Sequence, residues 1–106
     1  VTGFGLLGHL YKMMRASGTG AVIDSKAVPT IEGARRSMEE GFIPGGSRRN
    51  LAWVQDHLDV ADGISEEELI LLADAQTSGG LLVVGEVPGY PVIGHTVEGD
   101  GRIEIR

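Results

Sequence analysis

The chain contains no cysteine, so disulfide bonds, thiolate metal sites and a cysteine nucleophile are all excluded. Aromatic residues are scarce, with one Trp, two Tyr and two Phe, and a core must therefore be built mainly from Leu, Ile, Val, Ala and Met. We find neither a signal-peptide pattern nor an apolar run long enough to cross a bilayer. The resulting expectation is a soluble, cytoplasmic protein without a membrane partner.

Positive charge is also in short supply. Nine Lys and Arg face fifteen Asp and Glu, and the net charge of −6 argues against broad binding to nucleic acid. A small anionic substrate stays compatible with this charge, because backbone amides or a bound metal can hold it locally. The 106 residues fit one domain, and 42 % apolar with 23 % charged residues is ordinary for a globular protein.

Helical periodicity is clearest near the start of the chain. Over residues 5–17, one apolar face is formed by Leu6, Leu7, Leu10, Met13 and Met14. Gly18 marks the expected end of this helix. A short strand is expected over 21–24. A second helix is expected over 30–40, with Thr30 as its cap and with Ile31, Ala34 and Met38 facing inward.

The second half of the chain mixes both periodicities. Residues 43–50 read as a loop, and 51–58 fit a helix or a strand equally well. Ser65 and Glu68 form a capping box ahead of a helix that reaches Ala73. The apolar run 81–84 predicts a buried strand. Two further strands, over 92–97 and 102–105, are expected to form a hairpin through Gly99, Asp100 and Gly101.

The first motif is Gly3, Gly5 and Gly8, which match G-x-G-x-x-G and open a helix, with Asp24 after a following strand. By its letters alone this pattern matches the dinucleotide-binding fingerprint. That fingerprint requires a strand before its first glycine, and the sequence predicts neither this strand nor repeated βαβ units. We therefore disfavour nicotinamide binding. A helix opened by glycine still attracts anions through its free amides. For Gly8, tight helix packing is the preferred explanation.

Two further segments combine glycine with polar side chains. Residues 74–80, Asp-Ala-Gln-Thr-Ser-Gly-Gly, follow a helix and precede an apolar run, which is the reverse of a P-loop, and they contain no Lys. A ligand-contacting turn and a tight connector both remain open for this segment. Residues 45–50 carry Arg48 and Arg49, which fit a phosphate clamp but are more simply explained as solvated side chains. Asn50 fits a backbone hydrogen bond within this loop.

Taken together, these segments resemble one family. Residues 1–10, Val-Thr-Gly-Phe-Gly-Leu-Leu-Gly-His-Leu, resemble the start of the C-terminal domain of selenophosphate synthetases (selenide, water dikinases). Residues 45–51 resemble that family's Gly-Gly-Thr/Ser, Arg, Asn loop, and residues 73–82 resemble its Asp-x-Gln-Thr-Ser-Gly-Gly-Leu-Leu signature. Order and approximate spacing agree, and the resemblance covers residues 1–84.

The resemblance implies a fold and a reaction. The fold is an α/β (α+β) domain in which a mixed sheet packs against helices, and residues 1–106 form a single C-terminal domain of a larger two-domain enzyme. The reaction converts selenide, ATP and water into selenophosphate, AMP and phosphate. In the family, the ATP site, the reactive Cys or selenocysteine and the Lys lie mainly in an N-terminal domain. The full-length form uses Mg and ATP, and it dimerises largely through that N-terminal part.

By the same resemblance, this chain forms one wall of the cleft and is inactive alone. It starts at Val1 inside glycine-rich sequence, just after the position of the family's acidic metal ligand, so neither a catalytic nor a metal-binding residue is expected in it. The residues expected to line a substrate or phosphate cleft are Thr2, Gly3, Gly5, Asn50, Gln76, Thr77, Ser78 and Gly79. We expect their segments to converge on one rim.

One part of the chain departs from the family pattern. Residues 85–91 are too short for the helix that usually follows, so 85–106 is expected to be a divergent or truncated tail that leaves part of the sheet uncovered. Two alternatives to a selenium enzyme stay open. One is another enzyme of the wider superfamily, which includes aminoimidazole ribonucleotide synthetase and thiamine monophosphate kinase. The other is a binding or interaction module without catalysis.

Overall fold

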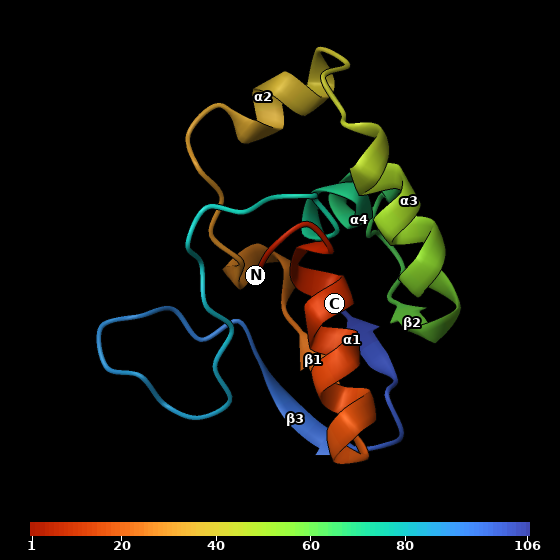
Figure 1. Ribbon diagram of the computed structural model, residues 1–106, viewed down its shortest axis with the longest axis vertical. Coiled ribbons are helices and arrows are strands. Elements are labelled where there is room, and N and C mark those ends of the chain that lie inside the picture. Colours follow the sequence, from red (N-terminus) through yellow and green to blue (C-terminus); the bar gives the residue numbers. More distant parts are fainter.

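The fold is one mixed sheet with helices packed against it (Figure 1), in a computed structural model that describes all 106 residues. Two short 3-10 turns lie at Ser25–Ala27 and Gln55–His57. The longer elements are α1 (Gly5–Ser17), β1 (Thr19–Ile23), α2 (Ala34–Glu39), α3 (Gly45–Val54), β2 (Leu58–Val60), α4 (Glu66–Leu72), β3 (Gly94–Glu98) and β4 (Ile103–Ile105). The predicted α/β class is therefore confirmed. None of the helices combines the length and apolar character needed to cross a membrane.

The strand order is β2-β4-β1-β3, which places β1 between the last two strands. β4 runs parallel to both β1 and β2, whereas β3 runs antiparallel to β1. The predicted hairpin between the last two strands is therefore wrong. Gly101 N donates to Thr19 O at 2.8 Å, and the chain crosses the start of β1 where Gly99 lies against Gly20. The Asp-Gly pair turns the chain over β1 instead of folding it back on β3.

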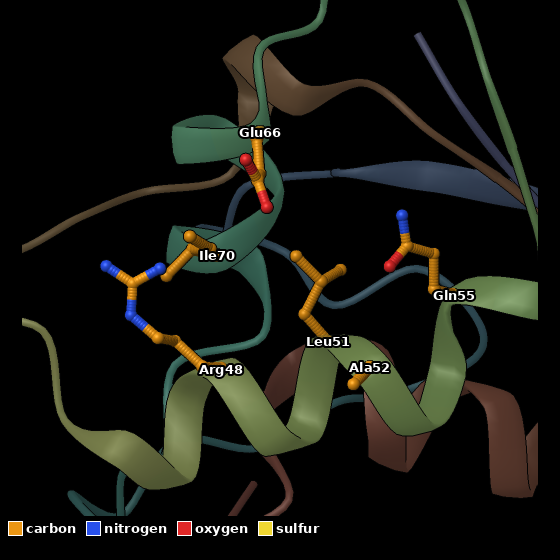
Figure 2. Close-up of a pocket in the computed structure, with 6 residues that line it drawn as sticks. All are labelled: Arg48, Leu51, Ala52, Gln55, Glu66 and Ile70. Atoms are coloured by element: carbon orange, nitrogen blue, oxygen red, sulfur yellow. The ribbon is translucent and has the colours of Figure 1, made fainter.

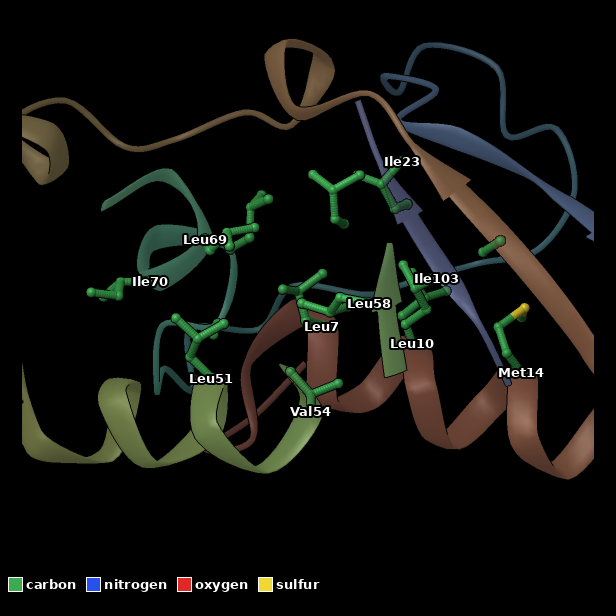
Figure 3. Close-up of a cluster of buried hydrophobic side chains, with 14 residues drawn as sticks. Leu7, Leu10, Met14, Ile23, Leu51, Val54, Leu58, Leu69, Ile70 and Ile103 are labelled. Atoms are coloured by element: carbon green, nitrogen blue, oxygen red, sulfur yellow. The ribbon is translucent and has the colours of Figure 1, made fainter. Parts of the chain in front are cut away.

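The core lies between the inner face of the sheet and the helices (Figure 3). Ile103 pairs with Ala21 on one side and with Leu58 on the other, and all three side chains are buried in the core. Ile105, two residues further along β4, lies on the same face and is buried in the core as well. The helices contribute Leu7, Leu10, Met14, Leu51, Val54, Leu69, Ile70 and Leu72.

α1 follows the sequence-based expectation closely. It runs over Gly5–Ser17, and Gly18 ends it in the left-handed conformation with φ 66°. The N–H of Gly18 donates back to the last turn, and Arg15 in that turn complements the helix dipole. Figure 1 shows α1 lying across the sheet, with α3 and α4 beside its N-terminal end. This end of the molecule therefore collects three of the helices around the first glycine-bearing segment.

Residues 45–50 form the first turns of α3, so the loop predicted there is wrong. Pro44 precedes the helix, and Ser47, Leu51 and Val54 are its buried residues. Their spacing of four and three residues is helical. The two consecutive glycines at the start of the segment disfavour a helix, so the sequence pattern predicts a loop instead. The ambiguous stretch 51–58 divides into the end of α3, the 3-10 turn and the first residue of β2.

Two other predicted elements differ from the structure. The second helix begins at Ala34 rather than near Thr30, and Ile31 is 82 % exposed instead of inward-facing. The predicted strand over 81–84 does not form, and Leu81 is 87 % exposed. β1 already has β4 and β3 as its two neighbours, so no central position in the sheet remains for this run. The connection between α4 and β3 instead extends outward as a wide loop (Figure 1).

α4 begins as the sequence predicts. Ser65 Oγ accepts a hydrogen bond from the N–H of Glu68 at 3.1 Å, and three glutamates occupy the first turn. We expect Ser65→Ala to lower the free energy of unfolding by about 1 kcal/mol, since it removes a helix cap. Urea unfolding followed by circular dichroism measures this loss. Ser37→Ala in the exposed α2 helix is the control, and an equal loss there would contradict the capping role.

The Glu68 carboxylate does not complete the capping box but accepts two hydrogen bonds from Arg35, at 2.6 and 2.9 Å. Hydrogen bonding from Arg35 lowers the pKa of Glu68 below its ordinary value. Because the folded pKa is the lower one, the pair contributes stability above the unfolded pKa of about 4.3, and this is lost as pH falls through the folded pKa.

The stability gap between wild type and Glu68→Gln should therefore shrink as pH falls from neutral to below that lowered pKa. Urea unfolding at a series of pH values measures the gap. Glu67→Gln is the matched control, because Glu67 takes part in no ion pair of the structure. A gap that stays constant over the whole series would show that the Arg35 pair contributes nothing to folding.

Candidate functional site

The first and last of the three glycine-bearing segments are in direct contact. Gly5 is buried and has φ +73°, and its Cα faces the backbone that follows α4. A Cβ at this position would lie 2.6 Å from Ala73 O and 2.7 Å from Asp74 O. Glycine is thus required here for both its conformation and its lack of a side chain. The segment 2–5 is thereby held against the start of the segment 73–80.

The middle segment joins the other two through Asn50. Its Nδ2 donates to Gly3 O at 2.8 Å and to Ala73 O at 3.1 Å. The hydrogen bond expected for Asn50 inside its own loop is replaced by these two long-range bonds, because α3 directs the side chain toward both neighbouring segments. Asn50 lies in the middle of this helix and is half-buried. All three segments therefore meet at one place in the fold.

Ser47 makes a second connection between α3 and the last segment. Its side chain is fully buried, and its Oγ donates to Asp74 Oδ1 at 2.7 Å while accepting from Ala75 N at 3.1 Å. One helical turn separates Ser47 from Asn50, so α3 holds residues 73–75 at two points. Nothing in the sequence singles out Ser47 or Asp74 beyond their place in the motifs.

Beyond this anchored base, residues 76–80 form an exposed turn. Gln76, Thr77, Ser78 and Gly79 are all exposed, and Gly79 has φ +83°. Ser78 Oγ donates to Gln76 Oε1 at 3.2 Å, which orders the two side chains. None of the backbone N–H groups from 76 to 80 donates to a backbone acceptor. The turn therefore presents a row of free amide donors that suits an anionic group.

The N-terminal end of α1 lies beside this turn. Thr2 and Gly3 are exposed, and no side chain caps the helix at Phe4. Thr2 Oγ1 is 2.8 Å from His9 Nε2, so the hydroxyl is held by a histidine one turn into the helix. The motifs of the sequence assign no separate role to His9. Thr2 and His9 are seven residues apart in the sequence, and they come into contact because α1 is a helix.

Gly8 serves packing, as predicted. A Cβ on Gly8 would lie 3.3 Å from the Trp53 ring, and the rings of Trp53 and Phe4 are 5.8 Å apart between centroids. Tyr11 packs edge-on against Trp53, and Lys12 lies over the Phe4 ring at 4.3 Å. Two of the three glycines of the G-x-G-x-x-G pattern are thus explained by close approaches, Gly5 to residues 73–74 and Gly8 to Trp53, whereas Gly3 has open space around it.

The arginines of α3 do not reach the site. Arg48 lines an open hollow of about 110 Å³ between α3 and α4, together with Leu51, Ala52, Gln55, Glu66 and Ile70 (Figure 2). The Arg49 guanidinium lies back along its own helix near Gly45. Solvated side chains are therefore the better explanation for both. No group of three or more His, Asp or Glu side chains in the chain lies close enough to hold a metal ion.

Known proteins resemble this chain over most of its length. Residues 1–105 match the family model described as AIR synthase related protein, C-terminal domain. Two relatives named selenide, water dikinase are 43 % identical over 86 residues (Haemophilus ducreyi) and 48 % identical over 83 residues (Carboxydothermus hydrogenoformans). These matches cover 81 % and 78 % of this chain and 24 % of each relative.

A third relative with the same name, from Dechloromonas aromatica, is 39 % identical over 120 aligned positions that cover 99 % of this chain and 34 % of the relative. That alignment is longer than the 106 residues present here, so the relative has residues without a counterpart in this chain. The chain spans about a quarter to a third of the length of these curated relatives. With nearly all of its residues matched by the family model, the chain belongs to the AIR synthase related protein C-terminal domain family.

Proposed function

We propose that this chain is the C-terminal domain of a selenide, water dikinase, an enzyme that makes selenophosphate from selenide and ATP with release of AMP and phosphate. The relatives that carry this name match most of the chain at 43 % and 48 % identity. The structural observation that carries the proposal is the free-amide turn 76–80, anchored beside the N-terminal end of α1. Both features attract phosphate groups.

In this proposal, the domain binds and orients but does not react. The exposed N–H groups of residues 76–80 donate to phosphate oxygens, and Thr77 offers a hydroxyl beside them, whereas the Ser78 hydroxyl donates to Gln76 and orders the turn. The free N–H groups at the start of α1 add the positive end of a helix dipole. Thr2, held by His9, lies at the same rim. These contacts position a phosphate, which is where protein groups contribute most in phosphoryl transfer.

The residues of this chain do not fit a magnesium site, since no suitable cluster of carboxylates and imidazoles is present. Mg and ATP would be held by an N-terminal ATP-binding domain, which is the partner that this domain requires. Magnesium neutralises phosphate charge during the transfer. The chain alone is therefore expected to be inactive, and the complete enzyme is expected to work as a homodimer in the cytoplasm.

The proposal is tested by a chimera in which this chain replaces the matching segment of the Carboxydothermus hydrogenoformans relative. We expect AMP formation that depends on selenide, and none from the 106 residues alone. A folded, dimeric chimera that forms AMP only with a ribonucleotide or a thiamine phosphate would assign the domain to another enzyme of the superfamily. A folded chimera inactive with all of these substrates would favour a binding module.

A further inference from the structure

We propose that Asn50 is a positioning residue that fixes the 2–5 segment relative to the 73–80 segment, and that it does not itself contact the phosphate. The predicted effect of Asn50 on phosphate binding rests on the proposed function. The structural part of the inference stands on the two hydrogen bonds from Asn50 Nδ2, at 2.8 Å to Gly3 O and at 3.1 Å to Ala73 O.

The donor capacity of Asn50 is fully used in this arrangement. A carboxamide nitrogen carries two hydrogens, and each is directed to a carbonyl of a different segment. No side-chain N–H remains to meet an anion, whose oxygens would need a donor. The cleft role predicted for Asn50 is therefore better assigned to the free backbone amides of residues 76–80.

The helix that carries Asn50 is well suited to this task. Leu51 and Val54 bury the inner face of α3 in the core, so the backbone that carries Asn50 is fixed by packing. Ser47, one turn earlier, holds Asp74 and Ala75 by its own two hydrogen bonds. The last segment is thus tied to α3 at two points, whereas Asn50 provides the side-chain tie from α3 to Gly3.

This asymmetry predicts different effects for the two ties. Asn50→Asp keeps the shape but places carboxylate oxygens against two carbonyl oxygens, and Asn50→Leu removes both donors without adding charge. Either change should release the first segment from α3 and shift the amide resonances of Gly3–Gly5. Ser47→Ala should instead shift those of Asp74 and Ala75, and leave Gly3–Gly5 near their wild-type positions. Arg49→Ala, at the exposed neighbouring position, should change neither set.

The experiment records ¹H–¹⁵N spectra of the 106-residue chain and of these four variants, followed by titration with inorganic phosphate. For Asn50→Leu we expect displaced Gly3–Gly5 resonances and phosphate affinity weaker by roughly 10- to 100-fold, because misplacing a binding group by ~1 Å has effects of this order. Folded Asn50 variants with wild-type Gly3–Gly5 resonances would overturn the proposal. Displaced resonances together with a wild-type chain that binds no phosphate would support the positioning role and count against the proposed function instead.

Discussion

Replacing Gly5 by Ala is expected to destabilise the domain by about 2–5 kcal/mol, the sum of ~1–2 kcal/mol for a left-handed residue with a side chain and ~1–3 kcal/mol for overpacking. The new Cβ would lie 2.6 Å from Ala73 O and 2.7 Å from Asp74 O, and both of these oxygens are backbone atoms that cannot rotate away. Urea unfolding of wild type and variant measures the loss. The α1 helix and the segment after α4 would have to separate to accommodate the methyl group.

Two other glycines separate the causes of this loss. Gly33 has φ +84° but open space around it, so Gly33→Ala carries the conformational cost alone. Gly3 has open space and no positive φ, so Gly3→Ala should be nearly neutral. A loss at Gly5 no larger than that at Gly33 would show that the close contact with Ala73 does not exist in solution.

Leu7→Ala is expected to have a comparable effect, with a loss of about 2–5 kcal/mol in the free energy of unfolding. The Leu7 side chain is fully buried in the centre of the core, beneath the sheet and beside α3 and α4 (Figure 3). Truncation leaves a cavity in the core between the helices and the inner face of the sheet. Calorimetry or urea unfolding gives the loss directly.

The matched control is Leu81→Ala, because Leu81 is the same residue type at 87 % exposure. This variant should stay within about 0.5 kcal/mol of wild type, as surface substitutions usually do. A large loss at Leu81 would mean that the run 81–84 is a buried strand after all, and that the outward loop in the structure is wrong.

The elements predicted well are those in which local signals and packing agree. α1 combines a continuous apolar face with Gly18 as its end, and α4 combines the Ser65 cap with an apolar run. In both, the sequence periodicity matches the face that the core buries. The family resemblance was also sound, since the family model covers residues 1–105.

The failures arise where tertiary contacts override local preference. Gly45 and Gly46 argued against a helix, yet a Cβ on Gly46 would lie only 3.2 Å from the Ala75 Cβ, so this glycine allows α3 to approach the last segment. Asp100 and Gly101 signalled a hairpin, but β1 lies between the two strands. Neither contact has a local sequence signature, because each depends on a segment more than 25 residues away.

The candidate site was predictable as a set of segments but not as a set of contacts. Motif order indicated that residues 1–10, 45–51 and 73–82 belong together, and the structure joins them where Asn50 bonds both Gly3 and Ala73. The functions of individual side chains were not accessible in the same way. Asn50 binds two backbone carbonyls, Ser47 is buried against Asp74, and His9 holds Thr2. Each of these follows from α3 or α1 being a helix at that position.

The central claim is that the turn before α1 and the turn after α4 are held together at one rim. Nuclear Overhauser effects in the 106-residue chain test it most directly. The account predicts contacts from the Gly5 α protons to the backbone of residues 73–74, and from the Asn50 side-chain amide protons to both Gly3 and Ala73 neighbours. Sharp, assigned resonances for these groups without any such contacts would contradict the account.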